Sequence, residues 1–430
     1  MRSSPLRRRV TASTTDSLTR MFRSLRVPNY RRFVYGHAVS IAGTWMQRVA
    51  QDWLVLELTD SAIAVGIATS LQFLPMLLFG VWGGVLADRY DRRRLLLGTQ
   101  AVSAVLASAL AACTLAGVTT IEIVYALALG LGLVTVIDTP ARQTFITDLV
   151  PEDDFVNVQS LNSTVHNVGR LVGPAVAGLL IASFGSGIAF TVNALSFVAV
   201  ILALLRIDPH ALHYTQQQPR GKGQARAGLR YVWGHPEIRA CLALVAVVAL
   251  LGQNFRVVLP LLARDTFGGG AEVYGWLTSA LGLGAIVGAL ATATRTRASA
   301  RSLTLWTVVF GLVNLLAAAV PTLTVALVVM VAMGVANITV NTLGRTVLLL
   351  QAEPAMRGRV IALHGMVFLG STPFGGPLLG WVCETWGPRA GFGVAGVSSM
   401  LIAATIFPRI RSLEAVSREA RAGSSPASPG

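Results

Sequence analysis

The sequence predicts an all-α membrane protein with twelve transmembrane helices, arranged as two six-helix bundles with pseudo-two-fold symmetry. Three observations support this fold class. Hydrophobic residues make up 53% of the 430 residues and charged residues only 13%, which is too little charge to cover a water-exposed globular surface. Long apolar stretches recur along the chain, and the basic residues collect between them, as they do in membrane proteins.

Twelve apolar stretches are long enough to cross a hydrocarbon core of about 30 Å at about 1.5 Å of helical rise per residue. Six precede and six follow a polar linker, and they are expected at residues 33–57, 62–87, 95–115, 121–139, 158–183, 188–205, 240–262, 273–293, 303–320, 322–342, 360–382 and 390–407. The chain therefore divides into a basic tail, a bundle, a cytoplasmic linker, a second bundle and another tail, at residues 1–32, 33–206, 207–238, 239–408 and 409–430.

The basic residues indicate the topology. Most of the 35 Lys and Arg lie in the tails, the linker and the segments after even-numbered stretches, whereas the opposite segments hold only Arg264 and Arg389. Because Lys and Arg stay in cytoplasmic loops, we expect a multi-pass protein of the bacterial inner membrane with both termini in the cytoplasm. Arg48, Arg170 and Arg256 fall inside apolar stretches, where a charge is costly and is usually paired or functional.

Two nearly equal offsets indicate an internal repeat. A shift of 208 residues pairs Arg48 with Arg256, and a shift of 203 pairs Arg142 with Arg345. Other landmark residues match in the same order at these offsets. Two parallel six-helix repeats of this kind are expected to hold a binding site near the membrane midplane, between the halves.

Several function classes are disfavoured. The three cysteines lie in apolar stretches without metal-ligand spacing, so neither a disulfide framework nor a metal site is indicated. The net charge of +15 comes without an RNA-binding signature, and no P-loop or accessible hydrolase motif is found. We expect no enzyme, no cofactor and no nucleic-acid partner. The expected partners are a small-molecule substrate, protons and the lipid bilayer, and the expected state is a monomer.

The segment after the second stretch carries a patterned loop. Gly84 allows close helix contact, and Asp88 can accept hydrogen bonds from an exposed helix N-terminus. Arg89, Arg92 and Arg93 offer guanidinium groups to carboxylates of a neighbouring helix. The loop is expected to act as a cytoplasmic gate. The alternative is that its arginines only anchor the cytoplasmic face.

The fifth stretch contains Gly169, Gly173, Pro174 and Gly178. Small residues let helices approach closely, and a proline removes a backbone hydrogen bond and bends its helix. The pattern predicts a pivot for rocking motions. Generic small-residue packing around a proline kink is the alternative, because the eleventh stretch has a similar pattern.

The loop, 84–93, resembles the GxxxD(R/K)xGRR signature of the major facilitator superfamily, with Asp91 in place of its glycine. The fifth stretch is similar to the GxxxGPxxGG signature of antiporters in that superfamily, with Ala177 as the departure. Residues 29–33, 137–143 and 161–163 resemble the transmembrane secretion effector branch, which includes the enterobactin exporter. The resemblance implies the major facilitator fold and proton-coupled efflux of siderophores, antibiotics or other lipophilic compounds.

In the first stretch, Arg48 and Asp52 stand four residues apart, which places them on one helix face as a possible ion pair. Trp45 and Gln51 occupy neighbouring positions and are candidate cavity residues. Asp52 is the leading candidate for a proton carrier, since helix movement that alters its distance from Arg48 would alter its proton affinity. A permanent structural ion pair is the alternative.

A polar stripe in the fifth stretch comprises Asn162, His166, Asn167 and Arg170. Such a stripe should face a cavity rather than lipid. His166 is a further candidate for proton coupling, although a lone histidine is more often only hydrogen-bonded. Polar residues at related places in the second half are the matching substrate candidates: Gln253, Asn254, Arg256, Asn337 and Asn341.

Asp138 lies near the cytoplasmic end of the fourth stretch, four residues before Arg142. We expect both in the cytoplasmic gate, with Asp138 within reach of Arg92 or Arg93. We expect Asp138 to form an ionic contact at the gate rather than to carry protons.

Within the predicted helices, three arginines outnumber the single mid-membrane acid, Asp52. This excess favours anionic or acid-bearing substrates. The expected function is secondary active transport, as proton-coupled efflux of small lipophilic or anionic molecules by alternating access. The alternatives are an importer or facilitator of a metabolite on the same fold, and a non-transporting membrane scaffold or receptor.

Overall fold

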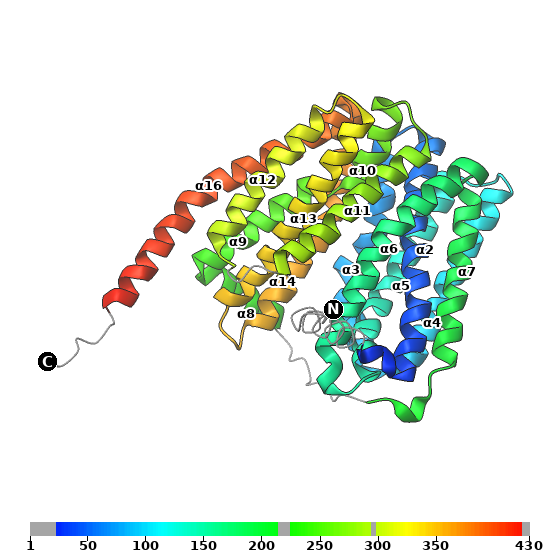
Figure 1. The fold of residues 1–430 in the computed structure, drawn as a ribbon, viewed down its shortest axis with the longest axis horizontal. Helices are drawn as coiled ribbons and strands as arrows, with labels where there is room; N and C mark the ends of the chain where they lie inside the picture. Colours follow the sequence, from blue (N-terminus) through cyan, green and yellow to red (C-terminus); the bar gives the residue numbers. More distant parts are fainter. Residues whose placement is uncertain (1–22, 214–223, 294–297, 424–430) are drawn as a thin grey trace, which may run out of the picture.

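The computed structural model describes residues 23–213, 224–293 and 298–423. Within these ranges the ordered elements are all helical. The first bundle, which stands upright in the blue-to-green part of Figure 1, consists of six long helices: α2 (Pro28–Thr59), α3 (Ala62–Arg89), α4 (Arg92–Leu115), α5 (Ile121–Asp148), α6 (Phe155–Phe184) and α7 (Ser186–Leu205). Short 3-10 turns flank them at η1 (Arg23–Arg26), η2 (Glu152–Asp154) and η3 (Pro209–Ala211).

The second bundle follows the short helix α8 (Gln224–Gly234), and two of its membrane-crossing segments are broken. The first of these is interrupted by two π-helical segments and runs through α9 (Pro236–Val247), η4 (Val248–Gly252), α10 (Phe255–Leu261) and η5 (Leu262–Thr266). The others are α11 (Ala271–Ala293), α12 (Ala300–Ala318), α13 (Leu323–Gln351), the consecutive pair α14 (Arg357–Gly370) and α15 (Thr372–Trp386), and α16 (Pro388–Gly423).

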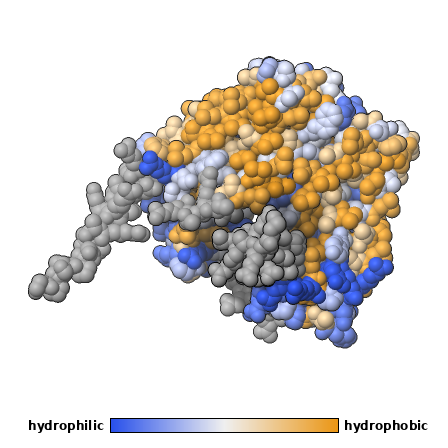
Figure 2. All heavy atoms as spheres, viewed as in Figure 1, coloured by the Kyte–Doolittle hydropathy of each residue, from blue (hydrophilic) through white to orange (hydrophobic). Residues whose placement is uncertain are grey.

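Eleven helical segments of the described chain are long and apolar enough to cross a membrane. They match the expected stretches except the first. Helix α2 falls outside this set because polar side chains such as His37, Arg48 and Asp52 lower its hydropathy, yet it packs along α6 and α7 as a full member of the bundle. Figure 2 shows apolar side chains over most of the visible flank of the helices. The predicted all-helical membrane fold is confirmed, and the eleven segments together with α2 are consistent with the expected twelve crossings.

Local capping explains one departure from the loop signature. The side chain of Asp91 accepts a hydrogen bond from the backbone N–H of Arg94 at 2.7 Å and so caps the N-terminus of α4. A carboxylate at this position also interacts favourably with the helix dipole. Asp91 therefore begins a helix where the signature has glycine.

The two bundles meet where α3 packs against α15 and where α6 packs against α11. Glycine makes both crossings possible. A Cβ on Gly66 would lie 2.5 Å from the carbonyl oxygen of Gly376, and a Cβ on Gly275 would lie 2.6 Å from that of Pro174. In both contacts the second crossing of one half packs against the fifth crossing of the other half. This arrangement has the expected pseudo-two-fold symmetry.

Polar contacts close one end of this interface. In Figure 1 the start of α2, helix α8 and the end of α16 lie on the lower side, which we call the terminal end, and the opposite side is the far end. At the far end Arg264 pairs with Asp60 at 2.7 Å. Glu384 accepts hydrogen bonds from the Ser61 hydroxyl at 2.8 Å and from the Ile63 N–H at 3.1 Å. The described hydrogen bonds between the bundles extend from this end towards the centre.

Candidate functional site

A buried ion pair joins the two bundles. Arg256 of α10 donates to both carboxylate oxygens of Asp52 on α2, from Nε at 2.8 Å and from Nη2 at 2.6 Å. The Tyr274 hydroxyl of α11 donates to the same carboxylate at 2.9 Å, and Arg256 Nη1 donates to Gln72 Oε1 of α3 at 2.9 Å. The Asp52 side chain has no exposed surface, so these donors, rather than water, must balance its charge.

The expectation that Asp52 pairs with Arg48 is wrong. Asp52 pairs with Arg256 of the opposite bundle, whereas Arg48 contacts the Trp45 ring, with its Cζ 4.7 Å from the ring centroid. Spacing along one helix reveals only the neighbours on that helix. Arg256 reaches Asp52 because it follows the break between η4 and α10, and its guanidinium offers the two-pronged geometry that a carboxylate binds best.

Sequence reasoning missed two members of this network, Gln72 and Tyr274. Tyr274 is 1% exposed, and its hydroxyl is hydrogen-bonded to Asp52. The sequence does mark both residues, since each is a polar side chain inside an apolar stretch, where it is expected to have a partner. Neither residue belongs to a motif, however, and their partners lie on other helices.

A second arginine also lies beside Trp45. The Cζ atom of Arg170 on α6 is 5.7 Å from the centroid of the Trp45 ring. Trp45, Arg48 and Arg170 are each half-buried, so the structure brings together three of the predicted site residues. Gln51, which follows on α2, is 1% exposed, and its amide has no hydrogen-bond partner among the described residues.

The polar stripe of α6 is partly accessible. His166 is exposed, and Asn162 and Asn167 are half-buried. His166 lies one turn from Arg170 and therefore on the same side of α6. The stripe thus continues from the arginine pair towards the terminal end.

The predicted pivot glycines contact two different partners. A Cβ on Gly169 would lie 2.3 Å from Ile41 Cγ2, and one on Gly173 would lie 2.7 Å from the Ala42 carbonyl oxygen, both on α2. Gly178 instead faces α11 of the other bundle. The same helix is therefore packed tightly within its own bundle at two glycines and against the opposite bundle at the third.

In the second bundle, three predicted residues form a chain of amides. Gln253 Nε2 donates to Asn341 Oδ1 at 3.0 Å, and Asn341 Nδ2 approaches Asn337 Oδ1 at 3.4 Å. Asn254 has a more local role, because its amide donates to the Leu250 carbonyl at 2.7 Å within the broken helix. A backbone carbonyl released by a helix break needs such a donor in a membrane.

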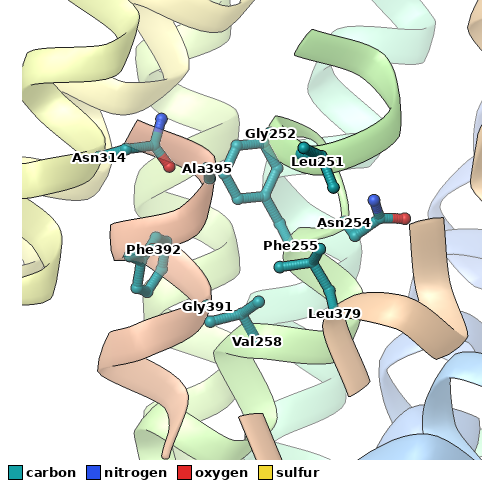
Figure 3. A pocket seen from close by; sticks show the side chains of 10 residues that line it. All are labelled: Leu251, Gly252, Asn254, Phe255, Val258, Asn314, Leu379, Gly391, Phe392 and Ala395. Atoms are coloured by element: carbon teal, nitrogen blue, oxygen red, sulfur yellow. The ribbon is translucent and has the colours of Figure 1, made fainter. Parts of the chain in front are cut away.

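A small pocket adjoins this break (Figure 3). The cavity volume is about 10 Å³, which is close to the volume that a single water molecule needs. Asn254 and Asn314 border it, with Phe255 between them in the view. A pocket of this size cannot hold a transported solute, so the candidate substrate site lies elsewhere.

Asp138 and Arg142, both expected at the cytoplasmic gate, contact each other, and Arg142 Nε lies 3.0 Å from Asp138 Oδ2. The Asp138 carboxylate also accepts hydrogen bonds from Thr99 and Gln100 of α4, both at 2.8 Å. Arg142 Nη1 lies 2.7 Å from Nδ1 of His37 on α2. This network joins three helices of the first bundle.

Arg92 and Arg93 do not reach Asp138, and that expectation was wrong. Arg92 pairs with Asp148 at 2.5 Å, and Arg93 donates to the carbonyls of Leu204 at 2.8 Å and Leu205 at 3.0 Å. Both arginines stand at the start of α4, beside the ends of α5 and α7. They therefore meet the helix termini there rather than Asp138, ten residues deeper in α5.

The residues of the loop that match the signature form few contacts. Asp88 and Arg89 are exposed, and neither belongs to an ion pair of the described chain. Gly84 is buried as expected. The tightest approach is at the preceding Gly83, where a Cβ would lie 1.9 Å from the Val136 carbonyl oxygen of α5.

Comparison with known proteins agrees with this architecture. A family model described as transmembrane secretion effector matches residues 19–427. The chain is 24% identical over 368 residues to the staphyloferrin A transporter of Staphylococcus aureus, with 84% of this chain and 91% of that protein covered. It is 29% identical over 397 residues to the multidrug efflux pump Tap of Mycolicibacterium fortuitum, with 88% and 95% covered.

Two solved structures share the fold. The nucleoside transporter NupG superposes with a TM-score of 0.73 at 14% identity, covering 88% of this chain and 98% of that one. A bacterial homolog of the human lysosomal transporter Spinster, in an inward-facing and unoccupied conformation, gives a TM-score of 0.68 at 16% identity, covering 90% and 95%. At these identities the likeness is one of fold.

Proposed function

Because this bacterial multi-pass membrane protein belongs to the transmembrane secretion effector family of major facilitator transporters, we propose that it exports small lipophilic or anionic molecules in exchange for protons. The observation that carries the proposal is the Asp52–Arg256 pair between the bundles. A mid-membrane acid that binds an arginine of the opposite half links a protonation state to the relative position of the halves.

The carboxylate of Asp52 accepts three hydrogen bonds, two from Arg256 and one from Tyr274. This arrangement suits the ionised acid. Protonation would remove one of the charges that hold the pair together, and Arg256 would then be free to separate from α2. Proton binding and separation of the bundles at this level are therefore coupled.

The distribution of basic residues supports a cytoplasmic position for the terminal end. On this orientation, the polar contacts of the far end close the protein towards the outside. With the ion pair formed and the far end closed, the state described here then corresponds to one with an ionised Asp52 that is ready to bind a substrate from the cytoplasm. The exposed part of α6 around His166 would line the route to the site.

Replacing Asp52 by asparagine tests this function. The variant keeps a hydrogen-bonding side chain of similar size but cannot exchange a proton. We expect at least a tenfold loss of proton-driven transport, because the step that couples the gradient to movement is removed. The measurement is substrate accumulation by proteoliposomes under an imposed proton gradient, with a panel of anionic, neutral and cationic compounds. Proton movement is followed by an enclosed pH dye.

A matched control is Asp153→Asn, which removes an exposed acid from the turn before α6. It should transport normally. Full accumulation by the Asp52→Asn protein would show that this acid is not the coupling group. Substrate movement in the same direction as protons in the unaltered protein would indicate an importer instead.

A further inference from the structure

The guanidinium groups of Arg48 and Arg170 share one aromatic neighbour but have no anion. They come from α2 and α6, and their Cζ atoms lie 4.7 and 5.7 Å from the Trp45 ring centroid. Among the described residues, neither guanidinium has a carboxylate partner or a hydrogen bond. Two half-buried cations in a helix bundle are costly without such a partner.

The nearest acid does not meet this need. Asp52 stands one turn from Arg48, but Arg256 and Tyr274 occupy its carboxylate oxygens. The cluster of Arg48, Arg170, Arg256 and Asp52 thus keeps an excess of two positive charges. An anion that enters from outside the protein would offset this excess.

Trp45 prepares the two arginines to bind such an anion. An arginine that stacks on an aromatic ring uses the face of its guanidinium and leaves the N–H groups at its edge free. Those edges match the two oxygens of a carboxylate or a similar oxyanion. Holding the arginines in place beforehand also reduces the entropy lost when the ligand binds.

We propose that Arg48 and Arg170, positioned by Trp45, form a subsite for the carboxylate of an acid-bearing substrate. The proposal rests on the function proposed above and narrows its substrate class to organic anions. It also gives Arg48 a role that the sequence did not assign to it, as a ligand for the substrate rather than the partner of Asp52. The arginines set the charge preference, and Trp45 is a positioning residue.

The test compares two ligands of the same shape and different charge, 2-naphthoate and its neutral amide, 2-naphthamide. The full-length protein in nanodiscs of zwitterionic lipid is titrated by calorimetry, and empty nanodiscs are subtracted. The acid can accept charge-assisted hydrogen bonds from the arginines, which are stronger than the bonds that the neutral amide can accept, so we expect the acid to bind at least about tenfold more tightly than the amide. Equal affinities would overturn the proposal.

Variants test whether the preference for the acid over the amide depends on the two subsite arginines. Arg48→Gln and Arg170→Gln should each reduce it to about threefold or less, while Arg48→Lys, which keeps a cation, should retain most of it. Arg31→Gln removes an exposed arginine from the same helix and should leave the preference unchanged. A glutamine variant of either subsite arginine that keeps the full preference would also overturn the proposal, and melting curves confirm that each variant is folded.

This binding assay separates the subsite from the transport cycle. A preference for the acid that depends on both arginines would support the subsite even if no proton-driven export were detected, in which case the proposed function would fail. Proton-driven export of neutral or cationic compounds together with equal binding of the two naphthyl ligands would leave the function standing and reject the subsite.

Discussion

Replacing Arg256 by glutamine is expected to destabilise the protein by about 3–5 kcal/mol, because it leaves the buried carboxylate of Asp52 without its cation. Unfolding of globular proteins has an entropy of about 2.1 cal/mol/K per residue. For a chain of 430 residues, a loss of this size lowers the melting temperature by at least about 3 °C. The melting temperature is measured by the loss of the monodisperse peak of the detergent-solubilised protein after heating.

The double variant Asp52→Asn/Arg256→Gln separates the ion pair from the rest of the site. It removes both charges together and leaves side chains that can still bond to each other, so most of the lost stability should return. It should nonetheless fail in proton-driven transport, as Asp52→Asn does. Arg31→Gln again serves as the control, since that arginine is exposed. An Arg256→Gln protein that melts like the parent would exclude this pair from the resting state.

The helices could be predicted from the sequence because hydropathy and charge distribution are local properties. The breaks could not. Gln253 lies between η4 and α10, and Ser371 between α14 and α15, although hydropathy predicts one continuous crossing through each region. The two breaks face each other, since a Cβ on Gly375 would lie 2.0 Å from the Leu250 carbonyl oxygen. Such an approach between backbones depends on tertiary packing.

The site shows the same division. Asp52 and Arg256 were identifiable as charges inside apolar stretches, which is a property of each stretch alone. Their pairing depends on how the two bundles meet. The internal repeat does not predict it, because the offset of 208 residues matches Arg256 with Arg48, the residue that was expected to pair with Asp52. The Asp138–Arg142 contact was predictable because four residues of one helix separate its members. The contact of Arg142 with His37 joins different helices and was not.

Placing a leucine at Gly178 is expected to shift the protein towards a state that is open at the far end. A Cβ at this position would lie 2.9 Å from the Ala271 carbonyl oxygen and 2.9 Å from Glu272 Cα. Both atoms belong to the backbone of α11, which can yield only if the bundles separate. Overpacking typically costs about 1–3 kcal/mol, which would change the ratio of the two states by about 5- to 150-fold.

The measurement uses a reporter cysteine at Ala62, in a background where the native Cys113, Cys241 and Cys383 are replaced by alanine. Ala62 is 1% exposed and faces Gly380 across the bundle interface. Its labelling by a membrane-impermeant maleimide should become at least about fivefold faster when leucine replaces Gly178. Gly393→Leu is the matched control, because a Cβ on that helical glycine meets nothing within 4 Å. Unchanged labelling in a normally expressed Gly178→Leu protein would mean that this crossing does not hold the far end closed.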